Sequence, residues 1–436
     1  MSGPASETSS ASETRSASEM GPAYRVWVVL LLALVYFFYM VDRSAIIVSQ
    51  EMIKNEFGLS DTQMGLLTGT LYGVSYALAG LPLGWAVDRT NRKKLLAGII
   101  AVWSGLTALS GLTTSFLQLA LARIGVGAAE SGGSPSSLSI LSDIFPPERR
   151  ATVTSLFYAG ASVGGIASFL IGGWIAQNYG WRAVFLTFGL PGLLLSLLVL
   201  FTLREPRRTA AKVASGGPRP GFLRDCWQTL RHPALRILYF ATALHMLSAA
   251  GVGTWTVPFL TRTAGLDIAT VGVVMGLASG LCGLLGAIGV GILADWSRRY
   301  GVRGPLCVVA LAIVIHVLGG LVVFMASSLP VVIAGLCVLG ATTSIQAGPS
   351  NAAISEVAPE ASRGMAFALY ATVANVVGSG LGPVLVGSLS DGLGGDGDAL
   401  RTAIIAVLLI ELLAAVAFVR ASLHHARAVT LNAAAA

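Results

Sequence analysis

Long apolar runs alternate with short polar stretches along the chain from Tyr24 to residue 421. A run of about 20 apolar residues is long enough to cross the hydrocarbon core of a bilayer as a helix. Residues 304–355 contain no Asp, Glu, Lys or Arg, but they are too long for one crossing, and a turn at 327–330 divides them. Cutting the chain where charges, prolines or Gly/Ser/Asp clusters interrupt the runs predicts twelve spans, at 24–50, 62–87, 95–112, 116–141, 150–177, 181–203, 233–261, 267–294, 304–326, 330–355, 363–390 and 399–421.

The composition indicates that lipid surrounds most of the chain. Apolar residues make up 54% of the sequence and charged residues 11%, whereas a soluble globular chain has roughly 25% charged residues. Mean hydropathy is +0.76 over the whole length. We therefore predict an integral membrane protein, and soluble classes are excluded.

The basic residues lie almost wholly between the apolar runs. The formal net charge of +7 therefore reports membrane topology and indicates no nucleic-acid partner. Alternate loops are basic, which predicts that both termini are cytoplasmic. Arg outnumbers Lys by 24 to 4, and with abundant Ala and Gly this is typical of a GC-rich bacterial source. We expect a multi-pass protein of the bacterial inner membrane. The cysteines lack metal-ligand spacing, so we expect no metal and no cofactor.

Five segments are predicted. Residues 1–21, with a repeated Ala-Ser-Glu and no apolar run, predict a disordered cytoplasmic tail and not a signal peptide. Residues 22–206 and 233–423 each hold six spans, and 424–436 form a second cytoplasmic tail. The basic segment 207–232 is predicted to be a cytoplasmic linker. It contains an amphipathic helix, because its apolar residues Phe222, Leu223, Cys226, Trp227 and Leu230 recur at helical spacing.

An internal repeat relates the two groups of spans. At an offset of 207 residues, Gly58, Leu59, Gly65, Gly69, Gly73, Gly84, Asp88 and Arg92 superpose on Gly265, Leu266, Gly272, Gly276, Gly280, Gly291, Asp295 and Arg299. A second stretch matches at an offset of 213. We therefore predict an all-α membrane protein with twelve transmembrane helices in two pseudo-symmetric six-helix bundles. Transporters built from such repeats bind substrate near the midplane between them.

Three motifs carry a family resemblance. Residues 84–94, with Gly84, Asp88, Arg89 and Arg92, resemble the signature loop of the major facilitator superfamily, and 291–299 resemble a weaker copy. Asp42-Arg43, the segment from Arg123 to Pro135 and the segment 145–151 are similar to the Spinster branch, which is associated with lysolipids and sphingolipids. Sugar-acid and organic-anion carriers share parts of this pattern. The resemblance implies the major facilitator fold and a transporter that works by alternating access, not an enzyme.

Ionisable residues inside the spans are candidates for function because they are costly in lipid. We expect Asp42 near Arg123, and Arg43 reaching toward Glu130, so that protonating a carboxylate releases its arginine to hold an anionic headgroup. A permanent ion-pair clamp between the first and fourth spans is the alternative. Proton coupling is assigned to Asp42 and Glu130. Substrate binding is assigned to residues expected to line the cavity, namely Arg43, Arg123, Glu130, Tyr76, Tyr158, Tyr370 and Asn375.

The second half holds three more ionisable residues inside spans. Superfamily resemblance places His245 at the cavity, so it is a candidate for proton or substrate handling, although a histidine satisfied within the bundle is the alternative. The same resemblance makes spans nine and twelve peripheral. We therefore expect His316 and Glu411 to be packing or interface groups.

The signature loop also predicts gates. Asp88 can face the start of the eleventh span near Ser362, and Arg92 can pair with Asp143 at the end of the fourth span. In the second half, Asp295, Arg299 and Glu356 are expected to do the same. These contacts are expected to close the cytoplasmic side. The alternative is that the basic residues only enforce topology.

The expected function is secondary active transport, because the chain has no nucleotide-binding loop. We expect a monomeric, proton-coupled carrier of a small amphiphilic or anionic substrate, with the headgroup among the four charges of the first half and the tail along the second half. A proton-coupled carrier of a small organic anion or sugar acid is the alternative. A membrane enzyme or lipid sensor is disfavoured, since no nucleophile motif, metal site or soluble domain is evident.

Overall fold

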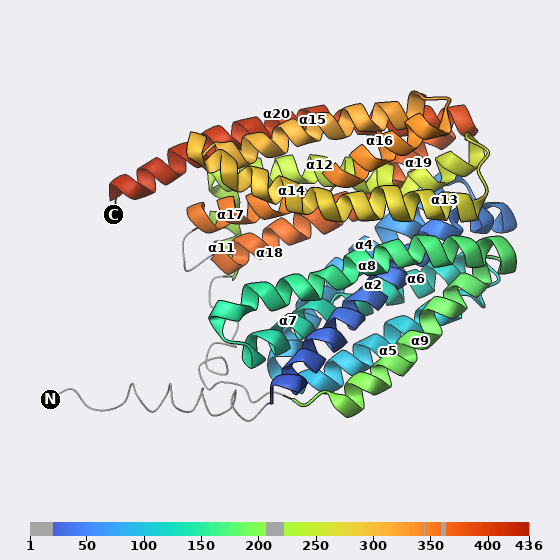
Figure 1. Ribbon diagram of the computed structural model, residues 1–436, viewed down its shortest axis with the longest axis horizontal. Helices are drawn as coiled ribbons and strands as arrows, with labels where there is room; N and C mark the ends of the chain where they lie inside the picture. The colour runs from blue at the N-terminus through green and yellow to red at the C-terminus, as the bar shows by residue number, and fades with distance from the viewer. Residues whose placement is uncertain (1–20, 206–221, 344, 359–362, 436) are drawn as a thin grey trace.

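The computed structural model describes residues 21–205, 222–343, 345–358 and 363–435. Nearly all of them are helical, and the helices form two bundles that lie side by side (Figure 1). Most of the tail predicted at 1–21, and residues 207–221 of the predicted linker, lie outside the described residues. The rest of the linker forms the short helix α11 (Phe222–Arg231), which ends just before His232, as the apolar spacing predicts.

The first half contains the first six predicted spans. Its elements are α2 (Pro22–Phe57), α3 (Asp61–Gly65), η1 (Leu66–Thr70), α4 (Leu71–Arg89), α5 (Arg92–Ser110), α6 (Phe116–Glu130), α7 (Gly133–Ile144), α8 (Pro147–Tyr179) and α9 (Trp181–Thr202). Within it, α2 packs along α8, and α5 packs along α9.

The second half repeats this order. Its elements are α12 (Pro233–Arg262), α13 (Ile268–Val274), η2 (Met275–Leu281), α14 (Cys282–Ser297), η3 (Arg298–Tyr300), α15 (Gly304–Met325), α16 (Leu329–Thr342), α17 (Ala347–Val357), α18 (Arg363–Val373), η4 (Ala374–Leu381), α19 (Gly382–Gly392) and α20 (Gly397–Ala435). The helix α12 packs along η4 and α19, as α2 packs along α8, and it also packs along α20, as α2 packs along α9.

The fourth span of each half is a broken helix. The break between α6 and α7 falls at Ser131 and Gly132, and its counterpart falls between α16 and α17. Eleven helices among the described residues are long and apolar enough to cross a membrane. The α6–α7 pair supplies the twelfth crossing, because the break divides its apolar length into two helices that are each shorter than a bilayer.

Repeated glycines lie where the two halves touch. A Cβ at Gly65 would lie 2.6 Å from the carbonyl oxygen of Pro383, and a Cβ at Gly73 would lie 2.9 Å from the Cα of Gly380. In the symmetry-related contact, a Cβ at Gly272 would lie 2.3 Å from the carbonyl oxygen of Phe169 on α8. The glycines of the sequence repeat at the start of the second span of each half therefore mark helix contacts between the halves, since only glycine permits these approaches.

The halves meet at one end and diverge at the other (Figure 1). We call the end where α3, α13 and α19 meet the closed end, and the end where α9 stops and α11 starts the linker end. Cross-half packing joins α3 and η1 to α19, and α8 to α13 and η2. The broken-helix segments α7 and α17 lie toward the linker end, where the bundles are apart.

Candidate functional site

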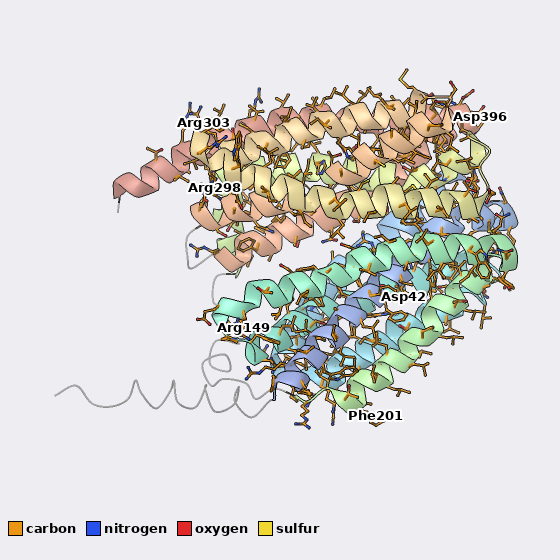
Figure 2. The ribbon with its side chains drawn as sticks, in the orientation of Figure 1. Asp42, Arg149, Phe201, Arg298, Arg303 and Asp396 are labelled. Atoms are coloured by element: carbon orange, nitrogen blue, oxygen red, sulfur yellow. The ribbon has the colours of Figure 1, made fainter. Side chains whose placement is uncertain are left out.

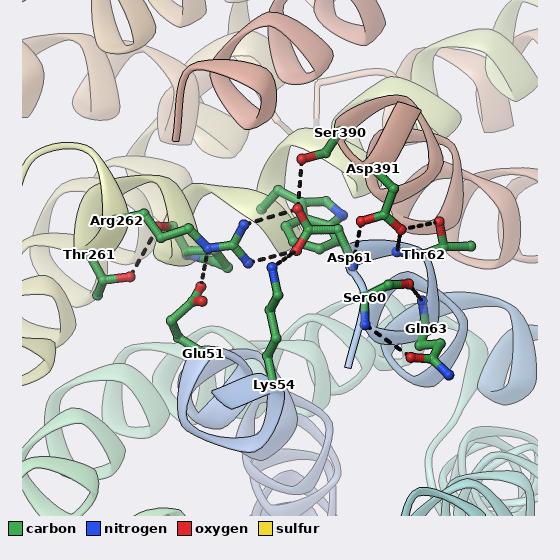
Figure 3. Close-up of polar contacts among 12 residues, drawn as sticks. Glu51, Lys54, Ser60, Asp61, Thr62, Gln63, Thr261, Arg262, Ser390 and Asp391 are labelled. Carbon is green, nitrogen blue, oxygen red and sulfur yellow. Dashed lines mark hydrogen bonds and ion pairs between the residues drawn. The ribbon is translucent and has the colours of Figure 1, made fainter. Parts of the chain in front are cut away.

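An ion-pair network at the closed end joins the two halves (Figure 3). The carboxylate of Asp61, which is fully buried, accepts two hydrogen bonds from the guanidinium of Arg262 at 2.8 and 2.9 Å. Lys54 donates to the same carboxylate at 2.5 Å, and Ser390 donates at 2.6 Å. Glu51 accepts from the Nε of Arg262 at 2.6 Å. Arg262 of the second half is thus held by two carboxylates of the first half.

A second contact beside this network also crosses between the halves. The Asp391 carboxylate, at the end of α19, accepts from the backbone N–H groups of Asp61 and Thr62 at 2.9 and 2.8 Å and from the Thr62 hydroxyl at 2.6 Å. These N–H groups belong to the first turn of α3, where intrahelical partners are lacking. The closed end is therefore held by charge pairs and by a helix cap supplied from the other half.

The four charges of the first half share one buried layer around Tyr72. The Tyr72 hydroxyl donates to Glu130 at 2.6 Å. The guanidiniums of Arg43 and Arg123 lie 5.0 and 5.3 Å from the centroid of the Tyr72 ring. Asp42 lies among the helices of the first half (Figure 2). It is fully buried, and neither of its carboxylate oxygens has a hydrogen-bond partner among the described residues.

The two ion pairs predicted within this layer are not formed. No ion pair joins Asp42 to Arg123, and none joins Arg43 to Glu130, in the described structure. Tyr72 takes contacts that were expected between the charges, since its hydroxyl binds one Glu130 oxygen and both guanidiniums lie against its ring. A permanent salt-bridge clamp between α2 and α6 is therefore absent from this conformation.

Arg43 reaches across to the second half. Its Nη2 donates to the hydroxyl of Ser379 in η4 at 2.9 Å, and its Nη1 donates to the Tyr39 hydroxyl at 3.4 Å. The Tyr39 and Tyr72 hydroxyls lie 3.4 Å apart. A chain of phenol groups therefore connects Glu130 to the arginine that touches the other half.

A cavity of about 370 Å³ lies between the halves beside Arg43. Arg43 and His316 are its ionisable lining groups among the described residues, and Arg123 and Glu130 are outside its wall. Most of its wall is apolar and comes from both halves, including Met40, Ile47, Phe169, Val252, Met275, Leu336 and Leu339. The cavity therefore offers one permanent cation in a wall that is mostly apolar and also carries six hydroxyl side chains and the His316 imidazole.

The other predicted lining residues lie away from this cavity. Tyr76 stacks near Tyr72, with ring centroids 5.9 Å apart. Tyr158 is 44% exposed and packs edge-on against Tyr36. Tyr370 donates to Gln346 at 2.7 Å. Asn375 is partly buried and donates to the Ala371 carbonyl, one turn earlier, at 2.9 Å, and it is not among the residues that line the cavity.

At the linker end, the described ion pairs of the predicted gate residues stay within one half. The predicted pair of Arg92 with Asp143 is present at 2.5 Å, and Arg92 also binds Glu205 at 3.0 Å. In the second half the prediction was wrong in one residue, because Arg298 and not Arg299 pairs with Glu356, at 2.7 Å. Arg299 instead lies over the Trp296 ring, at 3.4 Å from its centroid.

The remaining gate residues have no described cross-half contact. Asp295 is exposed. The side chain of Asp88 and the whole of Ser362 lie outside what the structure describes, so the predicted contact between them does too.

Two functional features escaped the sequence analysis. Tyr72 was passed over because a tyrosine inside a span carries no charge. Its position, three residues before Ser75 on a glycine-rich helix, gave no stronger signal. The Asp61 network was missed because Glu51, Lys54 and Arg262 fall at span ends, where charges are expected to face water. The one available signal was that only three residues separate the first span helix from Asp61, which keeps Asp61 close to Glu51 and Lys54.

Comparisons with known proteins agree with this geometry. The family model described as Major Facilitator Superfamily matches residues 32–383 and 304–434. The chain is 34% identical to an MFS-type efflux pump of Mycolicibacterium smegmatis, over 92% of this chain and 94% of that one. It is 27% identical to the cis,cis-muconate transport protein of Acinetobacter baylyi, over 79% of this chain and 82% of that one.

A solved structure shows the same fold. It is a bacterial homolog to the human lysosomal transporter Spinster, in an inward-facing and unoccupied conformation. The TM-score is 0.83 and the sequence identity 24%, with 94% of this chain and 99% of that chain covered. With twelve crossings in two repeated halves around a central cavity, and with a family match over most of its length, this chain belongs to the major facilitator superfamily of transporters.

Proposed function

We propose that the protein is a monomeric, proton-coupled secondary transporter that moves an amphiphilic, lipid-like anion of the lysolipid or sphingolipid type by alternating access. The observation that carries this proposal is the cavity between the halves, whose wall is apolar except at Arg43 and a few hydroxyl and imidazole groups. In this proposal, the halves 22–206 and 233–423 rock about the cavity while the linker 207–232 joins them in the cytoplasm.

The wall chemistry favours an amphiphile over a sugar acid. A polyhydroxylated substrate loses hydrogen bonds to water on entering a cavity and needs polar partners there in return. The wall of this cavity supplies mostly methyl, methylene and aromatic groups, many of them from α12 and α16 of the second half. An acyl chain along that side matches the apolar wall, and its anionic headgroup pairs with Arg43.

The layer around Tyr72 provides a route for proton coupling. Glu130 is buried and accepts from Tyr72, whose ring lies against Arg43 and whose hydroxyl neighbours Tyr39. Taking up a proton removes the charge of Glu130 and so weakens the attraction that this layer exerts on Arg43. Arg43 then gains freedom to leave Ser379 and bind an anion. Asp42, buried without a hydrogen-bond partner, is a second proton acceptor in the same layer.

The linker end is proposed to face the cytoplasm of a bacterial cell whose inner membrane holds the protein. Alternate basic loops and the basic linker support this orientation. The structure then corresponds to a state open to the cytoplasm. When the halves rock, Asp88, Arg92, Asp143, Asp295, Arg299 and Glu356 are proposed to close that end.

A small organic anion is the second candidate substrate. A relative that matches over 79% of this chain and 82% of its own length is named as a cis,cis-muconate transport protein. Such an anion would also bind Arg43. It would leave the apolar wall largely unused.

The proton-coupling proposal is tested with the Glu130→Gln variant in proteoliposomes. The amide cannot exchange a proton, so uptake driven by a pH gradient should fall at least about 10-fold, while exchange of internal for external substrate should fall less than about 3-fold. Equal gradient dependence in the variant and the parent would contradict the coupling role of Glu130.

The substrate class is tested by binding of ligands that differ in headgroup charge. A lysophosphatidylglycerol, a lysophosphatidylcholine of equal chain length and cis,cis-muconate are compared on purified protein. The Arg43→Ala variant should weaken binding of the anionic lysolipid about 10-fold more than that of the zwitterionic one, because only the former needs the cation. Muconate binding without lysolipid binding would favour the second candidate. Equal loss of every ligand would mean that Arg43 holds helices together.

Arg123→Ala is the matched variant in the same layer. Arg123 lies behind Tyr72 and outside the cavity wall, so its loss should weaken binding less than the loss of Arg43.

A further inference from the structure

Three ionisable side chains meet inside the second half, on three different helices. Glu411 of α20 lies between His245 of α12 and His316 of α15, and all three are buried. The Glu411 Oε1 is 3.7 Å from the His245 Nδ1 and 3.6 Å from the His316 Nε2. This arrangement differs from the peripheral packing roles expected for His316 and Glu411.

The hydrogen bonds of His316 determine which of its nitrogens faces the carboxylate as an acceptor. The Thr342 hydroxyl donates its single hydrogen to the backbone carbonyl of Val338 at 2.7 Å. With its hydrogen on that carbonyl, the hydroxyl accepts from the Nδ1 of His316, which lies 2.9 Å away. In a neutral imidazole the other nitrogen, Nε2, then carries a lone pair, and this lone pair faces the Glu411 carboxylate.

Two lone pairs facing each other in a buried site require a proton between them. The carboxylate oxygens of Glu411 and both nitrogens of His245 also lack hydrogen-bond partners among the described residues. A buried carboxylate without a hydrogen bond or a bound proton is costly. One proton on Glu411 or on either imidazole converts this contact between acceptors, at 3.6 to 3.7 Å, into an attractive one.

Within the described part of the second half, no Asp, Glu, Lys or Arg other than Glu411 lies at the same depth beside this site. The groups that act electrostatically on His316 are Glu411 and His245. On the elements packed against the cluster, α16 and η4 carry no Asp, Glu, Lys or Arg, and Arg43 of α2 lines the same cavity as His316. The remaining charges on α12, α14, α17, α19 and α20 sit toward the helix ends, at Arg236, Arg262, Asp295, Glu356, Asp391, Asp398, Arg401, Arg420, His424, His425 and Arg427.

The geometry points to a proton-binding site formed by His245, Glu411 and His316, which exchanges its proton with the substrate cavity through His316. His316 lines the cavity together with Arg43, so a proton on the cluster and an anion on Arg43 act on each other across one enclosed space. This inference rests on the proposed proton coupling. It adds a second site, in the half that lacks the Asp42 and Glu130 layer.

Histidine titration tests the site directly, without transport. The chain has 5 histidines, so ring-labelled histidine in purified protein gives few NMR signals, and His→Gln variants assign them. Between about pH 5 and pH 9 the signals of His245 and His316 should change together, because they share the carboxylate and its proton. Glu411→Gln should move the midpoints of both by about one pH unit or more and end their common behaviour.

Asp398→Asn is the matched control, since it makes the same carboxyl-to-amide change at an exposed site on the same helix. It should leave both midpoints unchanged. If Glu411→Gln does not yield a folded protein, Glu411→Asp keeps the charge, shortens the side chain, and should still separate the two titrations. Midpoints of His245 and His316 that are independent of Glu411, or signals that do not titrate, would overturn the proposal.

Transport separates this inference from the proposed function. In proteoliposomes, Glu411→Gln should reduce gradient-driven uptake at least about 10-fold and exchange less than about 3-fold. If the parent shows the coupled titration but no dependence on a pH gradient, the proposed proton coupling fails and the proton site stands. If uptake by the parent depends on the pH gradient and uptake by the Glu411→Gln variant depends on it equally, the coupling role of this site is overturned.

Discussion

The two ends of the molecule use the same residue types in different ways. At the closed end, Arg262 of the second half is held by Asp61 and Glu51 of the first half at 2.6 to 2.9 Å. At the linker end, Arg92 pairs with Asp143 within the first half, and Arg298 pairs with Glu356 within the second. The difference shows that ion pairs hold an end shut only where they cross between the halves.

The glycine contacts follow the same division. Gly65, at the closed end, touches the backbone of α19, whereas a Cβ at Gly84, further along the same span, would meet nothing within 4 Å. The sequence repeat contains both glycines. Only the structure shows that the contact at the closed end requires Gly65 and does not involve Gly84.

The largest expected effect comes from Arg262→Ala. It leaves the buried Asp61 carboxylate without its cross-half cation, with only the Ser390 hydroxyl still donating to it from the second half, and breaking a buried ion pair in this way costs about 3 kcal/mol or more. We expect the closed end to open in a large fraction of molecules. Spin-label distances between Asn178 and Asp396, in a chain whose 4 cysteines are replaced, should lengthen.

Lys54→Ala is the control for that experiment, because Lys54 binds the same carboxylate from the same half. It should change the distance distribution much less. If the two variants behave alike, the effect comes from the charge of Asp61 in general and not from the cross-half contact.

Gly65→Ala should have the next largest effect. The added Cβ would lie 2.6 Å from the Pro383 carbonyl oxygen, so the halves must separate or the helices must shift, at a cost of about 1–3 kcal/mol. Gly84→Ala should be neutral or slightly stabilising, since alanine favours a helix by about 1 kcal/mol over glycine. Thermal unfolding and the same pair of labels measure both. Equal destabilisation by the two substitutions would show that helix geometry, and not the contact, matters.

The smallest effect is expected for Arg298→Ala. This arginine and Glu356 are both partly exposed at the linker end, and such pairs contribute about 0.5 kcal/mol. The closed-end distance should stay that of the parent. A lengthening comparable to that of Arg262→Ala would contradict the view that only cross-half pairs hold an end shut.

Hydropathy and charge were enough to predict the spans, because lipid imposes length and apolarity on every crossing helix. The register of glycines at an offset of 207 residues predicted the two repeated halves. Charge inside the spans also located the layer of Asp42, Arg43, Arg123 and Glu130. The partners within that layer could not be predicted, because both arginines lie against the Tyr72 ring and an uncharged ring leaves no mark in a hydropathy pattern.

The second-half cluster was missed for a different reason. His316 and Glu411 are 95 residues apart in the sequence, and their spans were taken as peripheral. Their meeting depends on how α15 and α20 rotate about their axes, and a uniformly apolar helix gives no signal for that rotation. Arg298 replaced Arg299 as the partner of Glu356 because α14 ends in a short 3-10 turn, which shifts the direction of each side chain from the expected α-helical one.

The central claim is that the halves rock about the cavity, so that one end opens as the other closes. Spin-label distances across both ends of the same protein, measured with and without an anionic lysolipid at two pH values, test it most directly. The account predicts that a population with a shorter linker-end distance and a longer closed-end distance grows when substrate and protons are supplied. Ends that stay fixed, or that lengthen and shorten together, would contradict it.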